Sequence, residues 1–134
     1  MITKLNLIRD LEDIGVRSGD TLNVKASLRS IGEIQGGANT LIEALMEVVG
    51  EKGTIVTESF IRVASPLGFK FWKTVVDTHT SSYAGGMANA MLTYPGAILS
   101  THPVQRFALL GHRATELAEM HTKDSYAYEI LHIM

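Results

Sequence analysis

Apolar residues recur every three or four positions in two stretches near the N-terminus, which is the spacing of an amphipathic helix. In the first stretch these residues are Leu7, Ile8, Leu11 and Ile14. In the second they are Leu41, Ile42, Leu45, Met46 and Val49. Thr3 can cap the first helix and Gly15 can end it, while Gly50 ends the second, which begins near residue 38. The pattern predicts two helices that each bury one face.

Short apolar runs at residues 21–24 and 53–57 flank the second helix and predict strands. A helix between two short strands with tight glycine turns indicates a βαβ unit, and so an α/β fold whose neighbouring strands run parallel. Further along, the spacing predicts helices over residues 87–92 and 114–121 and strands over residues 97–99 and 104–110. Residues 60–82 show no period, and a loop of that length in a compact domain usually serves function.

Composition narrows the class of protein. The 134 residues, 46% of them hydrophobic, predict a single α/β domain over residues 1–134 with a substantial core. A net charge of −2 gives no electrostatic case for nucleic acid, and the absence of cysteine fits a reducing compartment. The N-terminus lacks the apolar stretch of a signal peptide, and no window is apolar enough to span a membrane. We therefore expect a cytoplasmic protein.

The stretch from residue 21 to residue 40 has the order of an anion site. A strand leads into a turn with Lys25, Ser27 and Arg29, and the adjacent Gly36 and Gly37 then open a helix. Glycine lets the backbone approach a ligand, and the free N–H groups and dipole of a helix start favour negative charge. A phosphate-bearing ligand such as a nucleotide or coenzyme A is the expected guest. The alternative is a strand–loop–helix connection whose glycines only turn the chain.

Three residues are candidates for catalysis or substrate binding. Pro103 restricts the geometry of His102, which could act as a general base, or could instead be a partly buried histidine that bonds the backbone at a turn. Glu58 ends a predicted strand, where ligands gather in open α/β sheets, and could bind a cation or support an imidazole; the alternative is a surface charge. Asp77 faces either substrate or solvent.

The other polar residues give weaker signals. The five histidines show no metal-binding spacing with a carboxylate, so no metal site is expected. We expect His79 and His112 at the surface. Ser27 lacks the setting of a nucleophile, and a binding role for its hydroxyl is more plausible.

Several segments together make the chain resemble the aminoglycoside 3-N-acetyltransferase family, which transfers acetyl from acetyl-coenzyme A to an amine of an aminoglycoside. The residues that carry the resemblance are, in chain order, 11–16 (LEDIGV), Gly19-Asp20, 24–28 (VKASL), Ile31-Gly32, Gly36-Gly37, Ala44-Leu45, Val49-Gly50, 53–56 (GTIV), Gly85, Pro95-Gly96, Ser100, His102-Pro103, Phe107, Gly111 and Ala114. Each match is short, but together they run in order over nearly the whole chain.

The resemblance implies a three-layer α/β/α sandwich with acetyl-coenzyme A as cosubstrate. It implies that the pantetheine and phosphates contact Lys25, Ser27, Leu28, Arg29, Gly36 and Gly37. Thr101 and His102 would lie near the acetyl group. Because the acceptor is polycationic, Glu58 and Asp77 are the candidates for its side of the cleft.

The chain also departs from the family pattern. The family usually has histidine where this chain has Lys25, serine in place of Ala26, and a Met-Pro-Thr-like sequence in place of Thr57-Glu58-Ser59. Arg106 replaces a serine that commonly follows the His-Pro pair. Members are roughly twice as long, with their best-supported catalytic histidine and acidic partner beyond the matched part, so the chain resembles the N-terminal half.

Three functions follow as hypotheses. The first is N-acetylation of an aminoglycoside, with His102 as base and Glu58 as its partner, and hence a role in antibiotic resistance. The second is a truncated, non-catalytic module that binds coenzyme A or another phosphorylated ligand. The third is acetylation of an amino sugar in polysaccharide biosynthesis. Because an incomplete sheet leaves an open edge and an apolar face, we also expect a homo-oligomer.

Overall fold

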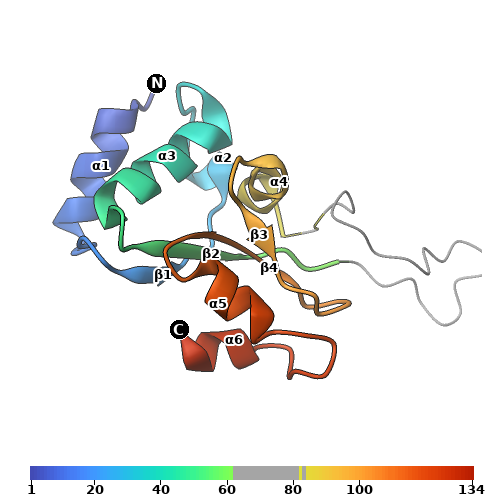
Figure 1. The fold of residues 1–134 in the computed structure, drawn as a ribbon. Helices are drawn as coiled ribbons and strands as arrows, with labels where there is room; N and C mark the ends of the chain where they lie inside the picture. Colours follow the sequence, from blue (N-terminus) through green and yellow to red (C-terminus); the bar gives the residue numbers. More distant parts are fainter. Residues whose placement is uncertain (62–81, 83) are drawn as a thin grey trace, which may run out of the picture.

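The computed structural model of the chain describes residues 1–61, 82 and 84–134 (Figure 1). Asp77 and His79, and most of the segment expected to be a functional loop, lie outside the described residues. The helices are α1 (Lys4–Asp13), α2 (Leu28–Ile31), α3 (Gly37–Val49), α4 (Gly86–Thr93), α5 (Ala114–Glu119) and α6 (Glu129–Ile133). The strands are β1 (Thr21–Asn23), β2 (Thr54–Glu58), β3 (Ile98–Leu99) and β4 (Phe107–Gly111).

The start of α1 confirms the predicted cap. The Thr3 hydroxyl accepts a hydrogen bond from the Asn6 backbone N–H at 3.3 Å, and the Asn6 side chain accepts one from the Thr3 N–H at 3.0 Å. Two N–H groups that the helix itself leaves unpaired are thereby satisfied. The short helices α2 and α6 were not predicted, because four or five residues give too few turns for a period to show.

The sheet has the strand order β1-β2-β4-β3. Strands β1 and β2 pair in parallel, as the βαβ pattern predicted, but β4 pairs antiparallel with both β2 and β3. The expectation of a mostly parallel sheet is therefore wrong, and the sheet is mixed. The βαβ argument applies only to the two strands joined through α3, whereas β4 returns from β3 through a short connection that reverses the chain.

Helices cover both faces of the sheet, which confirms the α/β/α layering (Figure 1). On one face α1, α3 and α4 pack against Ile55 and Ala108, and on the other α5 and α6 pack against Val56 and Leu109. Successive residues of β2 and of β4 thus point into different cores, as the two-residue repeat of a strand requires. Burying a side chain such as Ile55 or Leu109 fully contributes about 1.5–3 kcal/mol.

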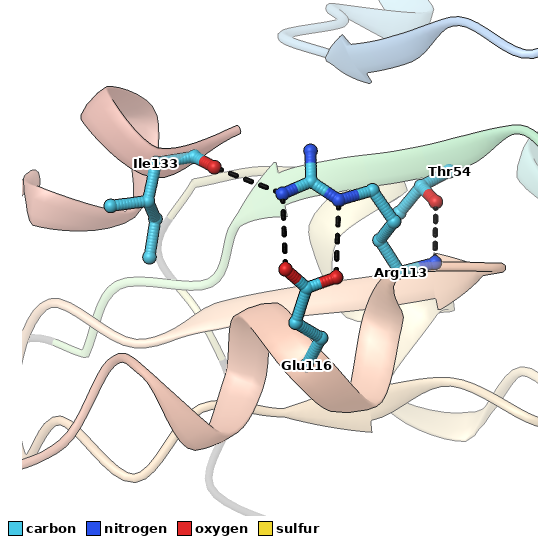
Figure 2. Close-up of polar contacts among 4 residues, drawn as sticks. All are labelled: Thr54, Arg113, Glu116 and Ile133. Atoms are coloured by element: carbon cyan, nitrogen blue, oxygen red, sulfur yellow. Dashed lines mark hydrogen bonds and ion pairs between the residues drawn. The ribbon is translucent and has the colours of Figure 1, made fainter.

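Arg113 ties the C-terminal helix to the sheet (Figure 2). Its backbone N–H donates to the Thr54 hydroxyl at 2.8 Å, at the start of β2. Its guanidinium donates to both carboxylate oxygens of Glu116, at 3.2 and 3.3 Å, and to the Ile133 carbonyl at 3.0 Å. One residue therefore joins β2, through its backbone, to α5 and the end of α6, through its side chain.

Candidate functional site

A pocket of about 410 Å³ opens where β1 and β2 end. Its lining comes from the segment after β1, the end of β2 and the first turn of α4: Val24, Lys25, Ala26, Ser27, Thr57, Glu58, Phe60, Ala84, Met87 and Ala88. The carboxyl ends of parallel strands are where open α/β sheets bind ligands. The place predicted from Glu58 at a strand end is thus a real cavity.

Lys25 and Glu58 form an ion pair in this pocket. The Val24 N–H donates to the Val56 carbonyl at 2.8 Å, which holds the chain after β1 alongside β2. The Lys25 Nζ then lies 2.7 Å from Glu58 Oε1. The hydrogen bond to Glu58 and its negative charge raise the pKa of the lysine, with a smaller contribution from Tyr128. The lysine is therefore a cation at neutral pH.

The two partners differ in exposure. The Lys25 side chain is 64% exposed, whereas that of Glu58 is 15% exposed. Glu58 Oε1 itself is buried, and in the described part of the chain it has the lysine ammonium as its charged neighbour and no further hydrogen-bond donor. The carboxylate is thus mostly buried in the pocket, whereas the lysine approaches it from the solvent side.

Ser27 lies beside this pair and caps the unpredicted helix α2. Its hydroxyl oxygen accepts from the Ser30 N–H at 3.3 Å and lies 3.0 Å from the Ser30 hydroxyl. Leu28 fills space between α2 and α4: a Cβ built on Gly86 would lie 2.8 Å from Leu28 Cδ1. Arg29 is exposed and outside the pocket lining. Of these three candidates for cofactor binding, only Ser27 lines the pocket.

Gly36 and Gly37 also lie outside the pocket lining. Both have left-handed backbone angles, φ of +85° and +68°, and they turn the chain into α3. A Cβ on Gly36 would collide with the Thr40 hydroxyl, which donates to the Gln35 carbonyl at 2.7 Å. The geometry gives the two glycines the turning role that the sequence left as an alternative, and their contact with a ligand stays a prediction.

His102 is held by the backbone around it. Its Nδ1 accepts from the N–H groups of Val104 at 3.3 Å and Gln105 at 2.9 Å. Burial is the main cause that lowers the pKa of His102, and the neighbouring His121 lowers it further. A backbone hydrogen bond with Ser125 has the opposite, smaller effect. His102 is therefore a neutral imidazole whose Nδ1 lone pair is already in use.

His121 is a buried partner that sequence reasoning missed. Its ring stacks on His102 with centroids 5.1 Å apart, and its Nδ1 lies 2.9 Å from the Ser100 hydroxyl. Its Nε2 faces the carbonyls of Tyr126 at 3.2 Å and Ala127 at 3.1 Å. Because carbonyls only accept, Nε2 carries the proton. Helical spacing could have found this residue, since it continues the buried face of Ala114, Leu117 and Ala118.

The structure gives different partners to the two residues predicted to act together. Within the described residues no hydrogen bond or ion pair joins His102 to Glu58; Glu58 lies with Lys25 in the pocket, and His102 lies with His121. Thr101 is exposed and belongs to the histidine pair, since its N–H donates to the His121 carbonyl at 3.2 Å. The catalytic role of His102 stays a prediction without a partner at the pocket.

Arg106 is a buried charged residue near the end of β2. It is 2% exposed, and its Nε donates to the Ser59 carbonyl at 2.9 Å. The predicted strand over residues 104–110 begins later, at Phe107, although the N–H groups of Ser59 and Ile61 still donate to the carbonyls of Arg106 and Val104, at 2.9 and 3.0 Å. In the sequence, an arginine at the edge of an apolar run was the available signal.

His112 is exposed, as predicted. Within residues 1–61, 82 and 84–134, no cluster of three or more potential metal-binding side chains occurs. No helix in that part of the chain combines the length and the apolar character needed to cross a membrane.

Comparison with known proteins gives a consistent result. Residues 24–129 match the family model described as aminoglycoside 3-N-acetyltransferase. Aminoglycoside N(3)-acetyltransferase VII of Streptomyces paromomycinus is 33% identical over 137 aligned positions, which cover 92% of this chain and 48% of that protein. The chain thus spans about half the length of the curated relatives that it matches.

Solved structures agree with the sequence match. The aminoglycoside acetyltransferase AAC(3)-Xa superposes with a TM-score of 0.81 at 31% identity, over 92% of this chain and 48% of that one. AAC-VIa, solved bound to sisomicin, superposes with a TM-score of 0.77 at 32% identity, over 89% of this chain and 49% of that one.

Proposed function

Because this chain belongs to the aminoglycoside 3-N-acetyltransferase family, we propose that it contributes to the transfer of an acetyl group from acetyl-coenzyme A to an amine of an aminoglycoside. The observation that carries the proposal is the pocket at the ends of β1 and β2, which holds a cation and a carboxylate side by side. One ligand of this reaction is polyanionic and the other polycationic, so a site that serves both needs both charges.

The anionic ligand fits the side of the pocket formed by Lys25 and Ser27. The lysine ammonium is 64% exposed, and the serine hydroxyl is exposed beside it. The first turn of α4 borders the same space, with Ala84, Met87 and Ala88 in the lining. Helix N-termini favour anions because their N–H groups are unpaired. Acetyl-coenzyme A supplies the thioester, and these groups would bind and orient it.

The acceptor amine fits Glu58. A protonated amine has no lone pair, so a basic group must first accept one proton from the ammonium. The amine nitrogen then bonds to the acetyl carbonyl carbon, the carbon–sulfur bond breaks, and coenzyme A leaves as a thiolate that takes up the second proton lost by the amine. A carboxylate that is mostly buried and held at a strand end can bind the ammonium and receive the proton. We assign both tasks to Glu58.

We assign a positioning role to His102 within this proposal. Its Nδ1 is the lone pair that a general base would need, and two backbone N–H groups occupy it. Its stacking on His121 fixes the turn that leads into β4. The proposal also includes a cytoplasmic location and assembly into a homo-oligomer. Assembly is expected because side chains such as Tyr126, which is 85% exposed, leave apolar surface uncovered.

Calorimetric titration tests the proposal. The purified chain is titrated with coenzyme A, and acetyl transfer to sisomicin is followed by release of the free thiol. We expect binding that Lys25→Glu abolishes, because the substitution puts a second carboxylate next to Glu58. Lys4→Glu is the matched control on another face, since Lys4 also forms an ion pair, 2.7 Å from Glu47. A folded chain that binds neither ligand would contradict the proposal, and acetylation of nucleotide sugars alone would redirect it.

A further inference from the structure

We propose that Lys25 is an internal competitor of the acceptor amine: its ammonium occupies the carboxylate of Glu58 until an anionic group of the coenzyme draws it away. The inference rests on the proposed function and adds an order to it. In the free chain the lysine ammonium would occupy the carboxylate, and binding of the anionic ligand would make the carboxylate available to the amine.

The first step of the argument is that the cation site is already filled. Lys25 Nζ lies 2.7 Å from Glu58 Oε1, the distance of a charge-assisted contact. That oxygen is buried, so the approach that the lysine uses is the approach that another ammonium would need. A primary ammonium of an aminoglycoside and the lysine ammonium have the same charge and nearly the same size. They therefore exclude each other at this oxygen.

The second step is that the lysine can leave. Its side chain is 64% exposed, and four rotatable bonds let the ammonium swing from the carboxylate toward the mouth of the pocket. An exposed lysine gains little from an ion pair, so the lysine itself loses little when it leaves. The buried Glu58 oxygen loses its cationic partner, so separation is favoured when an incoming ammonium takes the place of the lysine. Glu58, 15% exposed and fixed at the end of β2, cannot follow.

The third step is that an anion has reason to attract this lysine. Ser27, two residues further on, offers a hydroxyl in the same pocket, and the first turn of α4 lies on its border. A phosphate placed there gives the ammonium a second partner. Binding of the anion then uncovers the carboxylate, and binding of a cation at the carboxylate releases the lysine for the anion. Such coupling is reciprocal, so each ligand must strengthen the other by the same factor.

The test measures both ligands separately and together. Coenzyme A, which lacks the acetyl group and so allows no turnover, and sisomicin are titrated into the wild type, Lys25→Met and Glu58→Gln. From the strength of an exposed ion pair, we expect Lys25→Met to bind sisomicin about two- to fivefold more tightly than the wild type when coenzyme A is absent. For the same reason Glu58→Gln should bind coenzyme A about two- to fivefold more tightly, because its lysine is free.

The coupling supplies the decisive result. Saturating coenzyme A should strengthen sisomicin binding to the wild type and leave it unchanged in Lys25→Met. Lys4→Met, which breaks the ion pair with Glu47, should behave as the wild type throughout. Far-UV circular dichroism checks that each variant is folded, and Lys25→Gln serves if Lys25→Met is not.

Two failures can be told apart. If both ligands bind the wild type but Lys25→Met binds sisomicin no more tightly, the competition is refuted and the proposed function stands. If the folded wild type and the variants bind neither ligand, the proposed function and this inference are both refuted.

Discussion

The hydrogen bond between Ser100 and His121 should be a principal stabilising contact of the C-terminal part of the fold. The serine hydroxyl accepts from the Phe107 N–H at 2.9 Å and lies 2.9 Å from His121 Nδ1. Both side chains are buried, at 4% and 0% exposure. Since Nε2 carries the proton, Nδ1 is an acceptor and the serine donates to it. The Ser100 hydroxyl, which follows β3, and both ring nitrogens of His121, which follows α5, thus all have hydrogen-bond partners.

Removal of either side chain leaves buried groups without partners, and each costs about 1–3 kcal/mol. His121→Phe keeps the ring that packs edge-on against Phe107 but loses the bonds to Ser100 and to the carbonyls of Tyr126 and Ala127. We expect a loss of about 2–5 kcal/mol in the free energy of unfolding. Ser100→Ala leaves the Phe107 N–H and His121 Nδ1 unpaired and should cost about 2–4 kcal/mol.

The double variant tests whether the two single losses of stability both include the hydrogen bond between Ser100 and His121. Urea unfolding, followed by circular dichroism, gives the free energy for the wild type, both single variants and Ser100→Ala/His121→Phe. The double variant should lose less than the sum of the single losses, by about 0.5–1.5 kcal/mol. Additive losses with unchanged slopes against urea would refute the hydrogen bond between Ser100 and His121.

Three other predictions concern stability. Gly111→Ala should lower the free energy of unfolding by on the order of 3 kcal/mol, because φ is +118° and a Cβ would meet the Gly53 carbonyl. Thermal melting measures the loss, and Gly19→Ala, with φ +89° and open space around it, is the control for backbone strain alone. Arg113→Ala should lower the free energy of unfolding in urea by about 1–2 kcal/mol and increase hydrogen exchange in α6. A loss of stability without faster exchange in α6 would contradict the role of Arg113 in holding that helix. The folded state holds the pKa of His102 below its ordinary value of 6.5, so below that pH the folded chain binds fewer protons than the unfolded one. The melting temperature should therefore fall as the pH drops below 6.5. His102→Asn, whose Oδ1 can accept the same hydrogen bonds as Nδ1, should show a flatter dependence of melting temperature on pH.

The fold was predictable where the local pattern was strong. The Thr3 cap, the apolar face of α3 and the parallel pairing of β1 with β2 were visible in the sequence because each depends on neighbouring residues. The antiparallel position of β4 was not visible, because it depends on contacts such as Glu58 with Phe107, nearly fifty residues apart. The two shortest helices escaped for a different reason, since they form one turn each.

The candidate site divided in the same way. Lys25, Ser27 and Glu58 were selected for their chemistry, and the structure brings all three to one pocket. Gly36 and Gly37 carry the signal of an anion site, but their left-handed angles serve the turn into α3. A glycine pair looks the same in sequence whether the chain must bend or must admit a ligand, so only the path of the backbone separates the two.

The ion pair shows a further limit of sequence reasoning. Lys25 and Glu58 were each assigned to a different ligand, the lysine to the coenzyme and the carboxylate to the amine. The structure puts them 2.7 Å apart, so in the free chain each is the other's ligand. The proposed competition requires an anion that recruits the lysine, or a cation that recruits the carboxylate, to separate this pair, and the two ligands together share that cost. It therefore predicts that each ligand binds more tightly in the presence of the other than alone.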